Sequence, residues 1–275
     1  MIALTLLACG GDTDGGTTPD DLPRLADLPA PSCLSYEYLP LDDMGEPVVT
    51  QAAPELSFDA AGVDGLVTLL GAPELAPATY GVDTWRIRYR TQDRGQPVEA
   101  TAAVIVPRLA QPGPAPLLMW EHFTSGATDI CAPSAMGALG LGLPIAWAAK
   151  LGLVVVAPDY LGMNGLGAPA EQLHPYVVGE PTAIASLDAA RATLRLAEEQ
   201  GLAVTPDPAR TVVWGASQGG HAALWVDRYA PGYAPELTLR AVVAAVPPSD
   251  VVALADRGVT SWNDTSEPLV AVSTA

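Results

Sequence analysis

Four short segments of this chain consist almost entirely of apolar residues and do not alternate with polar ones. They cover residues 116–122, 152–159, 211–215 and 239–248. A strand without such alternation is buried on both faces, which is typical of parallel strands covered by helices. These segments constrain the fold more than any other feature, and they predict a mostly parallel sheet with helices on both sides.

Helical patterns lie between these segments, over residues 144–152, 181–201 and 217–229. The first two begin with a proline and end at a glycine, as helices commonly do. Strands that alternate with helices and use right-handed connections form a doubly wound α/β sheet.

Residues 84–91 and 98–107 predict an antiparallel hairpin that precedes the parallel strands, joined by a polar turn. In the first strand, apolar residues alternate with three arginines. One face of the hairpin is therefore expected to be wet, as at the edge of a sheet.

The length of the chain indicates a single domain, and its net charge excludes some classes of binding partner. The chain has 275 residues, of which 49% are hydrophobic, and this is enough for one large domain. Its net charge of −18, from 31 acidic and 13 basic residues, argues against binding to nucleic acid or to an anionic membrane surface. We expect an exported protein, monomeric, without a transmembrane helix.

The N-terminus predicts a lipid anchor. Residues 1–8 are apolar but too short to span a bilayer, and they end at Cys9 in "LLAC", which resembles the lipobox of bacterial lipoproteins. No lysine or arginine precedes Cys9, so residues 1–9 are interpreted as the remnant of a signal peptide. Residues 10–32 are rich in Gly, Thr, Pro and Asp and predict a flexible acidic tether.

If Cys9 carries lipid, Cys33 and Cys131 remain as a pair in an exported chain, and a disulfide between them is one hypothesis. The alternative is two buried free thiols that pack as small hydrophobic groups.

The segment "TVVWGASQGGHAALW", residues 211–225, predicts a buried strand, a tight turn around Ser217 and a helix. Gly215 and Gly219 complete the pattern G-x-S-x-G, in which a strained turn exposes the serine hydroxyl as a nucleophile. The alternative is an ordinary Gly-Ser turn at the end of a parallel strand.

A serine nucleophile needs N–H donors for the negative charge that develops on the carbonyl oxygen during attack. The backbone N–H of Gln218 is one candidate, because it lies at a helix N-terminus where the helix dipole favours negative charge. The second is expected near Phe123 and Thr124, in the small-residue loop that follows the strand ending at His122.

Four blocks of sequence, "EHFTSG…DICAPS", "VVVAPDYLGMNG", "HPYVVGEPTA" and "VVWGASQGGHAAL", together resemble the bacterial and fungal secretory lipase family of α/β-hydrolases. The resemblance runs from about Trp85 to Asp250. It implies an α/β-hydrolase fold and a serine lipase or esterase acting on acylglycerols or other esters, without a metal or organic cofactor. The family often has glycine where this chain has Phe123, which puts the shape of the oxyanion site in question.

The remaining polar residues have supporting roles in this interpretation. His122 is expected to anchor the oxyanion loop, and His174 to hold a loop beside the pocket through hydrogen bonds. His221 lies four residues after Ser217 on the same helix, so its ring should run along the helix instead of facing the hydroxyl. Asp159 could line the pocket, or equally form a salt bridge or a helix cap.

No histidine follows His221, although the acid and histidine of an α/β-hydrolase come after the nucleophile. Asp250 is not assigned as the acid, because in the resembled family a helical cap begins there. We therefore interpret residues 33–275 as an incomplete α/β-hydrolase domain and residues 248–275 as the start of a cap. Such a chain is expected to be weak or inactive, and poorly soluble through its exposed sheet edge.

Two other functions remain open. The protein could be a noncatalytic surface protein that uses the hydrolase fold to bind an apolar ligand. It could also be a serine peptidase or acyltransferase, because the same turn serves those reactions.

Overall fold

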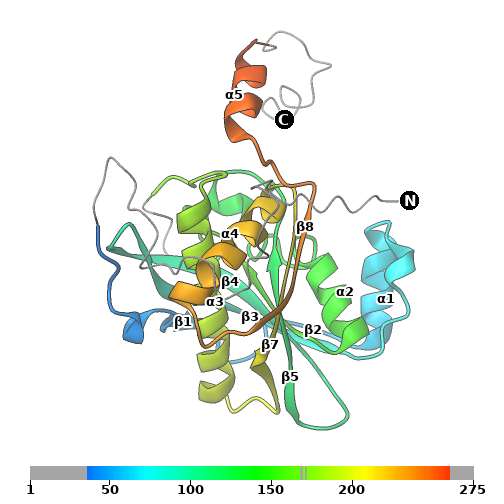
Figure 1. Cartoon of the computed structure of the whole chain (residues 1–275). Helices are drawn as coiled ribbons and strands as arrows, with labels where there is room; N and C mark the ends of the chain where they lie inside the picture. The colour runs from blue at the N-terminus through cyan, green and yellow to red at the C-terminus, as the bar shows by residue number, and fades with distance from the viewer. Residues whose placement is uncertain (1–35, 168–169, 171, 261–275) are drawn as a thin grey trace, which may run out of the picture.

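The computed structural model describes residues 36–167, 170 and 172–260 of the chain, and within them it forms one eight-stranded sheet (Figure 1). Seven strands follow the order β1-β3-β4-β6-β5-β7-β8, and β2 pairs with β3 beside β1. The strands are β1 Pro47–Thr50, β2 Leu56–Phe58, β3 Val82–Asp93, β4 Gln96–Pro107, β5 Gly113–Glu121, β6 Val154–Pro158, β7 Val204–Ala216 and β8 Leu239–Ala245.

The sheet is parallel on one side and antiparallel on the other. The pairs β6–β5, β5–β7 and β7–β8 are parallel, whereas β1, β2 and β6 pair in antiparallel fashion with β3 or β4. The four apolar segments of the sequence form the parallel part, as predicted. Their C-terminal ends lie at the same edge of the sheet, where α/β proteins place their sites.

Helices cover both faces of the sheet (Figure 1). The pair α3 and α4 packs on one face, and the pair α1 and α2 packs on the other. Helix α5 follows β8 and extends away from the sheet in Figure 1. The helices are α1 Ala60–Leu69, α2 Gly142–Leu151, α3 Gly179–Glu199, α4 Gln218–Tyr233 and α5 Val251–Thr260.

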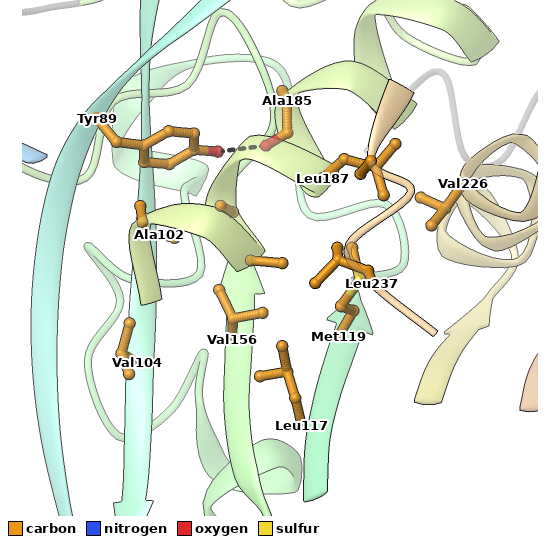
Figure 2. Close-up of a cluster of buried hydrophobic side chains, with 14 of the residues drawn as sticks. Tyr89, Ala102, Val104, Leu117, Met119, Val156, Ala185, Leu187, Val226 and Leu237 are labelled. Atoms are coloured by element: carbon orange, nitrogen blue, oxygen red, sulfur yellow. Dashed lines mark hydrogen bonds between the residues drawn. The ribbon is translucent and has the colours of Figure 1, made fainter. Parts of the chain in front are cut away.

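The larger core lies between the sheet and α3 and α4 (Figure 2). Leu117, Met119 and Val156 of the central strands belong to this core together with Leu187 of α3, and all four are buried. The Tyr89 hydroxyl donates to the carbonyl oxygen of Ala185 at 2.8 Å, which satisfies the one polar atom of that side chain (Figure 2). This core fixes the strand ends that carry the site.

The local chemistry of the helix ends matches the sequence. Helix α2 stops at Gly152, whose φ of 69° is the left-handed conformation that glycine adopts readily. Helix α1 starts at Asp59, whose carboxylate accepts the N–H of Gly62 at 2.7 Å. The sequence analysis did not predict α1, because its apolar residues are spread among glycine and alanine.

The structure confirms the predicted alternation of buried and exposed residues in the first strand of the hairpin, but the hairpin does not lie at the edge of the sheet. Trp85, Ile87 and Tyr89 are buried, while the arginines between them are partly or fully exposed. However, β3 is not an edge strand, because β1 and β2 pair with its outer side. These two strands are short and irregular, with a register shift in β1, which hides their period-two pattern in the sequence.

Several predictions fall outside the described residues: the signal remnant 1–9 with Cys9, the tether 10–32, Cys33, and the last part of the cap segment. Within the described part of the chain, no helix combines the length and apolar character needed to cross a bilayer. The same residues hold no cluster of three or more His, Cys, Asp or Glu side chains arranged to bind a metal ion.

Candidate active site

Ser217 lies at the junction of β7 and α4, as the sequence predicted. It occupies the N-cap position of α4 with φ 55° and ψ −119°, a backbone conformation that is strained for any residue other than glycine. Its N–H donates to the carbonyl oxygen of Ala245 in β8 at 2.9 Å. The side chain is partly exposed, so the strained turn presents its hydroxyl to solvent.

The two glycines of the motif are required by close packing. A Cβ atom at Gly215 would lie 1.9 Å from the carbonyl oxygen of Gly219, and one at Gly219 would lie 2.0 Å from the carbonyl oxygen of Glu121. Both distances are far below a van der Waals contact. Glycine at these positions therefore lets α4 start directly against β5.

The loop after β5 begins beside Ser217. Glu121 pairs in register with Gly215, and the main chain at residues 121–122 contacts Gly219. Among the described residues, no acceptor takes the N–H groups of Phe123, Thr124 or Gln218. These are the groups that the sequence analysis named as oxyanion donors.

Two side chains of this loop contact neighbouring residues. Phe123 is 46% exposed, and its ring makes an edge contact with Trp120, with ring centroids 6.3 Å apart. The Thr124 hydroxyl lies 2.8 Å from the hydroxyl of Tyr176, which joins this loop to the loop before α3.

His122 is buried and bonded to its own loop. Its Nδ1 donates to the carbonyl oxygen of Phe123 at 2.7 Å, and its ring stacks on Tyr160 with centroids 4.1 Å apart. Burial lowers the pKa of His122 to about 4, so the ring is neutral at physiological pH. These contacts hold the His122 ring against the loop that follows β5.

His174 contacts the residue that follows Ser217. Its Nδ1 donates to the carbonyl oxygen of Leu161 at 2.8 Å, and its Nε2 accepts from the side-chain amide of Gln218 at 2.8 Å. Burial lowers the pKa of His174, which favours the neutral ring that this pattern requires.

His221 points elsewhere. Its ring lies within reach of the main chain at Pro248 and Val177, and its centroid is 6.0 Å from that of Trp225. The chain has three histidines, and within the described residues none of them forms a hydrogen bond with the Ser217 hydroxyl.

Asp159 is fully buried and accepts three hydrogen bonds, from the N–H and hydroxyl of Ser134 and from the hydroxyl of Thr101. Asp159 is not among the residues that line the cavity at Ser217, and its hydrogen bonds hold Ser134, in the loop after β5, against Thr101 of β4. Burial raises the pKa of Asp159 to about 6.

Cys131 lies in the loop after β5, is partly buried and forms no disulfide with a described residue. Its pairing with Cys33 stays a prediction.

Glu121, Tyr160 and Ser186 are parts of the site that the sequence analysis missed. The carboxyl group of Glu121 is fully buried, accepts from the Ser186 hydroxyl at 2.8 Å and contacts the Tyr160 hydroxyl, and burial raises its pKa to about 8. A glutamate inside an otherwise apolar strand segment, "PLLMWEH", was the available signal.

A cavity of about 420 Å³ opens at Ser217. The turn after β8 and the first part of α5 form its other walls, including Pro247, Leu254 and Arg257. Asp250 also lines it, but its carboxylate accepts the N–H of Ala253 at 2.8 Å and so caps α5.

Known proteins share sequence with the part of the chain that carries this site. The family described as "Secretory lipase" matches residues 143–260. Lipase 6 of Candida albicans is 28% identical over 175 residues, which are 60% of this chain and 35% of that protein. Lipase A of Moesziomyces aphidis is 29% identical over 170 residues, which are 57% of this chain and 33% of that protein.

The chain is similar to the secretory lipases.

Solved structures share the fold of this chain. The rice cell wall degrading esterase LipA from Xanthomonas oryzae superimposes with a TM-score of 0.64 at 24% identity, over 80% of this chain and 54% of that one. A putative hydrolase from Legionella pneumophila gives a TM-score of 0.59 at 24% identity, over 74% and 52% of the two chains. The predicted α/β-hydrolase fold is confirmed. The chain spans about a third of the length of the curated relatives it matches.

Proposed function

We propose that the protein is a serine hydrolase that cleaves carboxylic esters, with acylglycerols as the first substrates to test, through an acyl-enzyme formed on Ser217. The observation that carries this proposal is the strained backbone of Ser217 at the N-terminus of α4. A protein gains nothing in stability from such a conformation, and strained residues of this kind cluster at active sites.

In this proposal Ser217 attacks the ester carbonyl, and the oxygen of the tetrahedral intermediate accepts the N–H of Gln218 and an N–H from Phe123 or Thr124. Three features support it: these N–H groups have no acceptor among the described residues, α4 directs its N-terminus at the site, and a cavity opens at Ser217. Loss of a single donor of this type typically lowers kcat by about 100- to 1,000-fold.

The base that activates Ser217 is not among the three histidines, because hydrogen bonds, ring contacts and main-chain contacts hold each of them in another place. The family that matches is named for secretion, which supports export of the protein. Anchoring through lipid at Cys9 remains part of the proposal.

The test is ester hydrolysis by the natural protein, including any sequence that continues past residue 275. Esters of increasing acyl length are compared with an aminoacyl amide, since the amide separates an esterase from a peptidase. Ser217→Ala should lose at least 1,000-fold in kcat/KM, whereas Ser57→Ala, on the far surface strand β2, should keep wild-type activity. Equal activity of Ser217→Ala and the wild type would overturn the proposal.

The noncatalytic alternative has one observation in its favour, the lack of a base beside Ser217 within the described residues. It predicts binding of an apolar ester without turnover, and equal binding by Ser217→Ala.

A further inference from the structure

Three stacked rings lie between the two segments that would hold the oxyanion. His122 and Tyr160 have centroids 4.1 Å apart at an interplanar angle of 25°, and Tyr160 and His174 have centroids 6.1 Å apart at 11°. They come from the end of β5, the turn after β6 and the loop before α3, and all three are buried. We call these three residues the ring stack.

One end of the ring stack holds the oxyanion loop. The Tyr160 hydroxyl donates to the carbonyl oxygen of His122 at 3.0 Å, and His122 Nδ1 donates to that of Phe123 at 2.7 Å. Two successive carbonyl groups are therefore fixed, which sets the orientation of the peptide planes that carry the N–H groups of Phe123 and Thr124.

The other end holds the residue after the nucleophile. His174 must carry its proton on Nδ1, because that atom faces the carbonyl oxygen of Leu161. Its Nε2 is therefore an acceptor, and the buried amide of Gln218 donates to it at 2.8 Å. This contact fixes the side chain of Gln218, whose backbone N–H is the first of α4.

The backbone around the rings is built for this contact. Tyr160 has φ 65°, which costs free energy in a residue other than glycine. Gly162 has φ 78°, and a Cβ atom there would lie 2.3 Å from the backbone N of His174. The turn after β6 therefore lets the loop before α3 approach closely enough for the rings to stack.

We propose that the ring stack is a positioning device that sets the N–H of Gln218 and the N–H groups after His122 at one fixed separation, with His174 as the residue that controls Gln218. This inference rests on the proposed function and adds residues that do not touch the substrate. An oxyanion forms only in the transition state, so misplaced donors lower kcat more than they raise KM.

The test is a double-mutant cycle in the natural protein. His174→Phe keeps a ring for stacking but removes both hydrogen bonds, and Gln218→Leu removes the partner while keeping its own backbone N–H. Each single variant should lower kcat by about 10- to 100-fold with KM within about threefold of the wild type. The double variant should be no worse than the poorer single one, because both changes break the same contact.

His174→Gln should restore part of kcat, since its amide oxygen can accept from Gln218. Tyr160→Phe tests the other end of the ring stack and should also lower kcat with little change in KM. Thermal melting of every variant controls for loss of fold, and kcat is compared only between variants that melt as one cooperative transition.

Failure of this inference can be told from failure of the proposed function. If the wild type hydrolyses esters but His174→Phe keeps kcat within twofold, or the two losses multiply in the double variant, the positioning role is wrong and the function stands. The role is also overturned if His174→Gln is as slow as His174→Phe. If the wild type itself neither hydrolyses esters nor reacts at Ser217, the proposed function fails first.

Discussion

Replacing Glu121 with glutamine should stabilise the protein in neutral and alkaline solution. The Glu121 carboxyl group is fully buried, its Oε1 has no hydrogen-bond partner among the described residues, and burial raises its pKa from 4.5 to about 8. Glutamine has nearly the same shape and stays neutral. Its amide oxygen can still accept from the Ser186 hydroxyl.

The size of the effect follows from proton linkage. Between pH 4.5 and 8 the folded protein holds the Glu121 proton and the unfolded chain releases it, so the free energy of unfolding falls as pH rises. Each unit of pKa difference corresponds to about 1.36 kcal/mol. Between pH 5.5 and 8, the wild type should therefore lose about 3 kcal/mol relative to Glu121→Gln, or roughly 5–10 °C in Tm for a chain of this size.

The assay is urea unfolding of both proteins at pH 5.5, 7 and 8, with the difference between them as the readout. Other buried groups, including Asp159 and Asp188 with pKa values raised to about 6, titrate in both proteins and cancel in that difference. The reasoning is refuted if the difference does not change with pH, or if Glu121→Gln is the less stable protein at pH 8.

Other predictions concern glycine packing and the sheet edge. Gly219→Ala should cost several kcal/mol of stability, because the new methyl group would lie 2.0 Å from the carbonyl oxygen of Glu121. Gly65→Ala in α1 should instead stabilise the protein by about 0.5–1 kcal/mol, because no atom lies within 4 Å of the new group. Similar unfolding midpoints for these two variants would contradict the packing argument. Strand β8 is at the edge of the sheet formed by the described residues, and Val243 in it is 38% exposed. Val243→Lys should therefore lower light scattering of concentrated samples of this 275-residue chain, and unchanged aggregation would mean that the chains do not associate through β8.

The sequence predicted the parallel half of the sheet better than the antiparallel half. Buried strands such as 154–158 show as unbroken apolar runs, and helix ends at residues like Gly152 follow known capping chemistry. Strands β1 and β2 have three or four residues each, too few for a period of two to stand out, so the hairpin of β3 and β4 was wrongly placed at the edge.

The part of the site that one local motif determines could be predicted from the sequence. The contacts between residues far apart in the chain could not. The pattern around Ser217 demands a tight turn, and this turn is what the structure contains. The contact of Gln218 with His174 joins residues 44 positions apart, and local spacing carries no trace of it. Asp159 was ambiguous for the same reason, because its partners Thr101 and Ser134 come from other elements.

The most direct test of the central claim is covalent labelling of the natural protein with a fluorophosphonate, read by mass spectrometry of its peptides. A fluorophosphonate reacts only with an activated serine beside working oxyanion donors. The account predicts a single adduct, on the peptide that contains Ser217, and its loss in Ser217→Ala. An unlabelled protein, or an adduct on another serine, would contradict the assignment of Ser217 as the nucleophile.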